Sequence, residues 1–269
     1  MKLYFALSSG EDNKQILNVS KDANILASYF YFNKSTRLEQ LKKLNVFNTD
    51  NFILDSGAFS AYTLNKVIDI QEYIDFIKNN EIKQYANLDD IGNPKQTAKN
   101  YEIMLKAGLK PKPVFHTGES LEYLEPLLNT DYIALGGMVK ATNLEEWLDK
   151  VFNFIYKRNP KIKIHGFGMT NLKLVQKYPW FSVDSTSWLA PVAFGRFKRW
   201  NDKRENFKTF TTDEILKNEG MFYDNKMPAD FRNFLIREQV KEYLKFEKHV
   251  NKREQKTDFS YITAQQTLF

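Results

Sequence analysis

Short apolar runs alternate with amphipathic segments along the chain as far as about residue 190. The apolar runs are typical of strands that are buried on both faces, as parallel strands are. The amphipathic segments repeat their apolar residues at the spacing of a helix; residues 69–77, for example, place Ile70, Tyr73 and Ile77 on one side. The pattern predicts strands that alternate with helices, an order that makes the strands parallel.

Eight runs are predicted as strands, at residues 3–7, 24–30, 52–54, 84–88, 112–115, 132–135, 161–164 and 180–183. Helices are predicted at residues 35–45, 69–77, 94–107, 121–128, 144–156, 172–177 and 229–249. Eight such units favour a closed (β/α)8 TIM barrel of one domain, an architecture of typically ~250 residues. A doubly wound open sheet is the alternative. The barrel domain is expected to span residues 1–250, with a polar tail at 251–269.

The segment after the last predicted strand, residues 189–210, is rich in both basic and aromatic side chains. We expect an exposed insertion in the barrel, whose Arg196, Lys198 and Arg199 contact nucleic-acid phosphates. An ordinary solvated loop is the plainer interpretation. Residues 211–214 read Thr-Thr-Asp-Glu, the pattern of a capping box at the start of a helix.

Composition excludes several classes of site. The 269 residues contain no cysteine, which excludes disulfides, thiolate zinc sites and iron–sulfur clusters. No apolar run approaches the ~18 residues of a membrane span, and the N-terminus lacks the pattern of a signal peptide. We therefore expect a cytoplasmic protein that does not engage a membrane. The formal net charge of +6 fits either a polyanionic partner or a bias in coding composition.

Polar residues and glycines follow the predicted strands at their carboxyl ends, where barrel enzymes hold their active sites. These positions are Asp55, Asp89, His116, Gly136, Gly137, His165 and Asp184. A single strand-terminal Asp is most simply a turn or helix cap, and the histidines and glycines have equally plain structural interpretations. Three carboxylates at equivalent places in a repeating pattern favour an active site over three separate caps.

Missing motifs narrow the chemistry further. The sequence has no Gly-x-Ser-x-Gly elbow, no Walker loop, no Gly-x-Gly-x-x-Gly after its first strand and no His-x-His pair. A carboxylate–histidine metal site remains open as an alternative. The remaining chemistry pairs one Asp as a nucleophile with another as acid and base, which fits substitution at an anomeric carbon.

Five segments occur in an order that resembles the tRNA-guanine transglycosylase superfamily. They are Asp55–Phe59, Leu88–Asp90, Ala134–Met138, His165–Gly168 and Val183–Asp184. The short chain is most similar to the DNA-directed members of phages and bacteria. The resemblance implies a pentosyltransferase of a bacterial or phage-infected cell that exchanges guanine in DNA for a free 7-deazaguanine base, such as 7-cyano-7-deazaguanine. It implies no cofactor, and it leaves room for accessory modification proteins.

The same resemblance implies a role for each residue of the motifs. Asp184 would attack C1′ of the nucleotide and form a glycosyl-enzyme, and Asp55 would protonate the departing base and deprotonate the incoming one. Phe59 would stack on the base, and Asp89 would accept hydrogen bonds from the guanine N1–H and amine. Further base contacts would come from Ser56, His116, Gly136, Gly137 and His165.

The chain also departs from the family pattern. Ala58 replaces the second glycine of the first motif, His116 stands where the tRNA enzymes carry Gln, and His165 stands where they often carry Met. The cysteine-rich zinc subdomain that helps those enzymes engage tRNA is absent, which favours another polynucleotide. Three alternatives stay open: tRNA-directed RNA modification, a metal-dependent or retaining barrel hydrolase, and a non-catalytic nucleic-acid-binding barrel.

Overall fold

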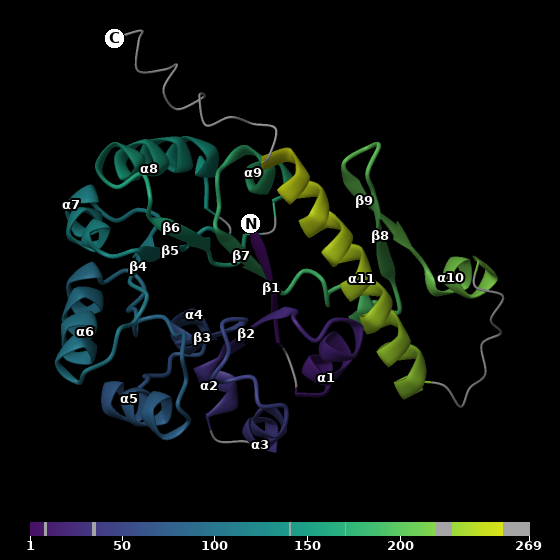
Figure 1. The fold of residues 1–269 in the computed structure, drawn as a ribbon, viewed down its shortest axis with the longest axis horizontal. Helices are drawn as coiled ribbons and strands as arrows, with labels where there is room; N and C mark the ends of the chain where they lie inside the picture. Colours follow the sequence, from purple (N-terminus) through teal and green to yellow (C-terminus); the bar gives the residue numbers. More distant parts are fainter. Residues whose placement is uncertain (8–9, 34–35, 140, 170, 219–227, 255–269) are drawn as a thin grey trace, which may run out of the picture.

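A curled sheet of seven parallel strands forms the centre of the computed structural model (Figure 1). The structure describes all residues except 8–9, 34–35, 140, 170, 219–227 and 255–269. The sheet order is β3-β2-β1-β7-β6-β5-β4. The strands are β1 (Lys2–Ala6), β2 (Asn24–Ser28), β3 (Phe52–Asp55), β4 (Val114–His116), β5 (Tyr132–Gly136), β6 (Lys163–Gly166) and β7 (Ser182–Ser185). The predicted α/β class with parallel strands is confirmed.

Residues 84–88, the predicted fourth strand, lie between the two edges of this sheet. They form two isolated parallel bridges rather than a strand, one from Tyr85 to Leu54 of β3 and one from Ala86 to Lys112, just before β4. The Leu54 N–H donates to the Gln84 carbonyl at 2.9 Å, and the Asn87 N–H donates to the Lys112 carbonyl at 2.9 Å. The segment therefore bonds to the chain on both sides of the gap between β3 and β4.

The described helices lie mostly around the outside of the curled sheet (Figure 1). They are α1 (Gly10–Val19), α2 (Tyr29–Phe32), α3 (Thr36–Lys43), α4 (Ala58–Thr63), α5 (Ile70–Asn79), α6 (Pro94–Lys106), α7 (Leu121–Leu124) with η1 (Glu125–Asn129), α8 (Leu144–Arg158), α9 (Leu172–Lys177), η2 (Val192–Phe194), α10 (Thr212–Asn218) and α11 (Pro228–Glu254). Of these, α1, α2, α4 and η2 were not predicted. The predicted strand 24–30 is wrong at its end, because Tyr29 and the next three residues form α2.

The largest hydrophobic cluster lies between the sheet and its helices, as expected for strands that are buried on both faces. Trp180 and Trp188 are packing residues within this cluster. The Trp180 Nε1–H donates to the Leu174 carbonyl at 3.1 Å, and the Trp188 Nε1–H donates to the Ala6 carbonyl at 3.1 Å. Each buried indole therefore keeps a hydrogen bond, which avoids the cost of an unpaired buried donor.

Two small clusters of side chains line the inner face of the curled sheet. One contains Tyr4, Ala6, Leu26 and Ile53 from β1, β2 and β3, and the other contains Ala86, Val114 and Ala134. Phe167, which follows β6, packs against both clusters. Because one ring contacts both groups, the sheet curls far enough to bring its two halves face to face across Phe167.

The segment after β7 forms an antiparallel hairpin of β8 (Phe197–Asn201) and β9 (Asn206–Phe210). It lies beside α11 (Figure 1). The ring of Trp200 packs 4.9 Å from that of Phe246, and Phe207 stacks 4.6 Å from Tyr243. The expectation of an exposed aromatic insertion at 189–210 is therefore wrong for Phe197 and Trp200, which are buried against the long helix.

Two expectations for the C-terminal third concern helix ends. The Thr211 N–H donates to Glu214 Oε2 at 2.8 Å and the Glu214 N–H donates to Thr211 Oγ1 at 3.4 Å, so the predicted capping box at the start of α10 is confirmed. α11 continues to Glu254, so residues 251–254 are helical, and the rest of the predicted tail, 255–269, lies outside the described residues. Within the described residues, no helix is both long and apolar enough to cross a membrane.

Candidate active site

Asp55, Asp89 and Asp184 come from separate parts of the chain and act on one another electrostatically. Asp55 ends β3, Asp89 follows the bridging segment, and Asp184 lies in β7. Burial raises the pKa of Asp55 to about 8, and the negative charges of Asp89 and Asp184 add to that rise. The Gly57 N–H, which donates to Asp55 Oδ2 at 3.0 Å, opposes the rise. The three carboxyl groups therefore lie near one another, and at neutral pH Asp55 carries a proton.

The turn after β3 holds Asp55 and Ser56 in place. Gly57 has φ +82° and caps α4, and a Cβ at this position would collide with Phe30 and the Ser28 hydroxyl, so only glycine fits. The Ser56 Oγ–H donates to Asp89 Oδ1 at 2.6 Å, which joins the turn to the second carboxylate. Phe59, the second residue of α4, is 55% exposed and is available for stacking.

His116 is held between two carboxylates. Its Nε2 lies 2.9 Å from Asp89 Oδ2 and its Nδ1 lies 3.3 Å from Glu119 Oε1. The His116 N–H also donates to Glu119 Oε2 at 2.9 Å. Burial alone would lower the pKa of His116, but the hydrogen bonds and charges of Asp89 and Glu119 outweigh it and raise the pKa to about 9. At neutral pH the ring is therefore an imidazolium that donates from both nitrogens.

The two glycines at the end of β5, Gly136 as its last residue and Gly137 just after it, have different roles. A Cβ on Gly136 would lie 2.7 Å from His116 Cδ2, so the imidazole can occupy its place only because residue 136 has no side chain. Gly137 is exposed, has φ +72°, and a Cβ there would lie 2.7 Å from Thr117 Oγ1. Gly136 thus positions His116, while Gly137 makes the turn.

Asp184 lies at the end of a buried chain of hydrogen bonds. His165 Nε2 is 3.2 Å from Asp184 Oδ1, and the Gly168 N–H donates to the same oxygen at 2.9 Å. On the other side of the ring, Nδ1 is 2.8 Å from Ser182 Oγ, which lies 2.6 Å from the Tyr132 hydroxyl. In the tautomer with a proton on Nε2, the His165 ring donates to Oδ1 and, with the Gly168 N–H, fixes the orientation of the carboxyl group.

Sequence reasoning missed three residues of these networks. Glu119 is three positions after His116, in a Thr-Gly turn that gave no signal of its own. Ser182 shares the inner face of β7 with Asp184, because side chains two positions apart on a strand point to the same side. This alternation alone could have predicted that Ser182 lies near the site. Tyr132 was read only as the start of a strand.

The predicted phosphate-binding residues do not belong to these networks. Arg196 and Arg199 are exposed, and the Arg199 guanidinium lies over the rings of Phe197 and Phe210 at 5.5 and 5.3 Å. Lys198 lines a separate cavity behind β7. Its side chain therefore faces away from the three carboxylates.

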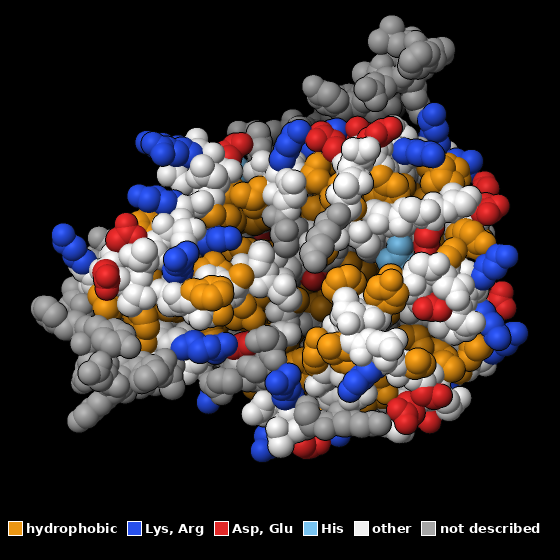
Figure 2. Space-filling model, turned by 180° about the vertical axis from the view of Figure 1, so that it is seen from behind, with side chains coloured by type: hydrophobic (Ala, Val, Ile, Leu, Met, Phe, Trp, Pro, Cys, Tyr) orange, Lys and Arg blue, Asp and Glu red, His pale blue; other side chains and the backbone are white. Residues whose placement is uncertain are grey.

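The surface beside the carboxylates is partly apolar. Figure 2, seen from behind, shows a histidine side chain and acidic side chains among exposed hydrophobic ones. The exposed hydrophobic residues that follow β3 and β5 are Phe59, Tyr62, Leu64, Val67 and Val139. Among the described residues, no group of three or more His, Asp or Glu side chains is arranged to hold a metal ion. The site therefore offers carboxyl, imidazolium and aromatic groups to an uncharged or flat ligand.

Comparison with known proteins does not assign this chain to a family. No family model matches the chain, and no curated protein matches it.

Proposed function

We propose that the chain is a base-exchange glycosyltransferase that replaces guanine in DNA with a 7-deazaguanine. The observation that carries the proposal is the difference between two neighbouring carboxyl groups. Asp55 has its pKa raised to about 8, first of all by burial, whereas Asp184 Oδ1 accepts from the Gly168 N–H and lies 3.2 Å from His165 Nε2. A protonated carboxyl group that acts as the acid and a second, oriented carboxyl group that acts as the nucleophile are the pair that substitution at an anomeric carbon uses.

Asp184 is the proposed nucleophile. Its Oδ1 is occupied by His165 and by the Gly168 N–H, and Oδ2 has no hydrogen-bond partner among the described residues. Oδ2 would attack C1′ of the target nucleotide as the C1′–N9 bond breaks, and guanine would leave with the bonding electrons. The product of this step is a glycosyl ester of Asp184.

Asp55 is the proposed acid and base. Its proton would pass to the departing guanine, which then leaves as the neutral base. The resulting carboxylate would take a proton from the incoming 7-deazaguanine, whose nitrogen attacks C1′ and releases Asp184. The two halves of the exchange together return Asp55 and Asp184 to their starting forms, so the reaction needs no cofactor.

Asp89 and Phe59 are the proposed groups for base recognition. Asp89 receives Ser56 on one oxygen and His116 on the other, and each oxygen keeps a second lone pair for the N1–H and amine of guanine. The exposed ring of Phe59 would stack on the base. Recognition requires the base to leave the helical stack, because the reacting bond is buried in a duplex.

We also propose that the sheet closes into a (β/α)8 barrel, with residues 84–88 in the place of the eighth strand. The bridges of Tyr85 to β3 and of Ala86 to Lys112 support this, as does Phe167 between the two inner clusters. Arg196 and Arg199 on the hairpin are the proposed phosphate contacts, since exposed guanidinium groups neutralise a nucleic-acid backbone.

The direct test incubates the protein with 7-cyano-7-deazaguanine and either duplex DNA, single-stranded DNA or tRNA, followed by digestion and nucleoside analysis by mass spectrometry. Modified deoxynucleoside supports the proposal. Modified nucleoside from tRNA alone assigns the enzyme to RNA, and release of guanine without incorporation assigns it to the hydrolases. Absence of all three products, with binding of DNA retained, leaves a binding protein and overturns the enzymatic proposal.

A further inference from the structure

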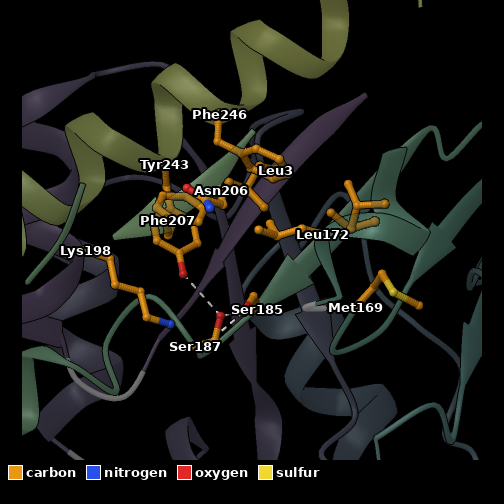
Figure 3. Close-up of a pocket in the computed structure, with 12 residues that line it drawn as sticks. Leu3, Met169, Leu172, Ser185, Ser187, Lys198, Asn206, Phe207, Tyr243 and Phe246 are labelled. Atoms are coloured by element: carbon orange, nitrogen blue, oxygen red, sulfur yellow. Dashed lines mark hydrogen bonds between the residues drawn. The ribbon is translucent and has the colours of Figure 1, made fainter. Parts of the chain in front are cut away.

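A cavity lies on the outer side of β7, bounded by α9, the β8–β9 hairpin and α11 (Figure 3). Its volume is about 310 Å³. Side chains alternate along β7, so Asp184 faces the inside of the curled sheet while Val183 and Ser185 face this cavity. The cavity and the carboxylate site therefore lie on opposite faces of one strand.

The polar groups of the cavity converge at one end. Ser185 Oγ lies 2.6 Å from Ser187 Oγ, which lies 3.3 Å from the Tyr243 hydroxyl. Figure 3 shows the Lys198 ammonium pointing toward these hydroxyls from the hairpin. The ammonium has no hydrogen-bond or ion-pair partner within the part of the chain that the structure describes. A positive charge and three hydroxyl groups thus share one end of the space.

Apart from Asn206, the rest of the wall is apolar and comes from β1, β7, β9, α9 and α11 and from the loop before α9. Its residues are Leu3, Met169, Leu172, Val175, Val183, Phe207 and Phe246. Most of these side chains are fully buried and belong to the main hydrophobic cluster. An occupant therefore meets a cation and hydroxyl donors at one end and a preformed hydrocarbon surface along its length.

We propose that this cavity binds a small carboxylate with an apolar body, such as a medium-chain fatty acid anion. The volume falls at the lower end of the ~300–1,000 Å³ typical of small-molecule sites, which suits a ligand of this size. One lysine with hydroxyl donors matches a monoanionic carboxylate; a phosphate would leave the hydrocarbon wall unused. The proposal concerns a separate site and does not rest on the base-exchange function.

Three probes separate the charge of the ligand from its apolar body: sodium octanoate, 1-octanol and inorganic phosphate, each titrated into the full chain by calorimetry and by thermal unfolding. We expect octanoate to bind and to raise Tm, octanol to bind at least tenfold more weakly, and phosphate to leave Tm unchanged. Equal binding of octanol and octanoate, tighter binding of phosphate, or no binding of octanoate would overturn the proposal.

Two variants and a control place the bound probe. Lys198→Met should weaken octanoate binding at least tenfold, because it removes the charge and keeps the length of the side chain. Leu172→Trp should abolish binding by filling the cavity from the first residue of α9. Lys203→Met, at an exposed position in the hairpin turn outside the cavity lining, should bind octanoate as the wild type does. If Lys198→Met and Lys203→Met have the same affinity, while both unfold at the wild-type temperature, octanoate is not held in this cavity.

Discussion

The imidazole of His116 and the carboxylate of Asp89 form a buried ion pair, with 2.9 Å between Nε2 and Oδ2 and less than a tenth of either side chain exposed. A second carboxylate, Glu119, takes the other ring nitrogen. A buried imidazolium would be costly on its own, and the two carboxylates make it the favoured form. The pair therefore links the protonation of the site to the stability of the fold.

His116 should make the protein less stable at high pH. Its pKa is about 9 in the folded protein and ordinarily 6.5, so its stabilising contribution is complete below pH 6.5 and is lost as the pH rises through about 9. His116→Gln should lack this part of the dependence. Urea unfolding of both proteins at pH 6 and pH 9.5 measures it. An equal loss of unfolding free energy in the two proteins would contradict the assignment.

Asp55 should impose an alkaline limit on base exchange. The reaction needs its proton for the departing guanine, and its pKa is about 8, so the rate should fall as the pH rises above that value. Initial rates from pH 6 to pH 9.5 give the profile. A rate that stays constant through pH 9.5 would remove Asp55 from the role of acid.

Asp55 should also make the wild-type protein less stable as the pH rises. Between pH 3.8 and about 8, Asp55 is protonated in the folded protein and ionised in the unfolded one. The wild type should therefore lose stability as the pH rises through this range. Asp55→Asn removes the titration. The unfolding free energy of the variant, relative to the wild type, should therefore be higher at pH 8 than at pH 4, and a relative value that does not change with pH would refute the raised pKa.

Asp184→Asn should lower the exchange rate by at least about 10⁴-fold, because an amide is a poor nucleophile toward C1′. The fold should remain intact, since the amide keeps the size of the carboxyl group. Asp75→Asn is the matched control, because Asp75 is exposed on α5, away from the site. Mass spectrometry of protein mixed with DNA should find a covalent adduct in the wild type and the control alone. If the Asp184 variant turned over at the wild-type rate, a covalent intermediate on Asp184 would be excluded.

Gly136→Ala should displace the His116 ring, because the new Cβ would lie 2.7 Å from Cδ2. We expect destabilisation of about 1–3 kcal/mol from this overpacking. Adding His116→Ala removes the obstacle, so the double variant should lose less stability than the sum of the two single variants. A double-mutant cycle measured by urea unfolding tests this, and strictly additive effects would show that the two residues do not contact.

Ser182→Ala should cost about 1–3 kcal/mol of stability, because it leaves His165 Nδ1 and the Tyr132 hydroxyl buried without their shared partner. Tyr132→Phe removes only the last group of the chain and should cost less. Thermal unfolding of both variants gives the order. A larger loss for Tyr132→Phe would mean that the serine is not the centre of the network.

Most strands of this fold were predictable because they lie in or next to short runs of apolar residues, although β6 and β7 begin two residues later than predicted. Residues 84–88, Gln-Tyr-Ala-Asn-Leu, were predicted as a strand but pair with their neighbours at two bridges only, a detail that composition does not carry. Helix α1 escaped prediction because its position depends on a distant partner: Asp12 is fully buried and pairs with Arg232 of α11 at 2.9 Å. The aromatic run at Tyr29 read as a strand, but Tyr29 packs 4.9 Å from Tyr73 as part of α2.

Placement of the carboxylates at strand ends was accessible from the sequence, whereas their partners were not. That His165 meets Ser182 depends on the register between β6 and β7, in which these two residues are paired. That Lys198 faces a cavity behind β7 depends on how the hairpin packs on α11. Both facts belong to tertiary packing, which local patterns of polarity do not encode.

The position of Phe167 between the two inner clusters constrains the order of events in the proposed exchange. Phe167 and the two clusters occupy the interior between the halves of the curled sheet. In the proposed exchange, the departing guanine and its replacement would therefore both pass through the opening at the carboxyl ends of the strands. The first base would have to leave the site before the second could enter, and the sugar, bound to Asp184 in the interval, would keep its place in the DNA strand until the second base arrives.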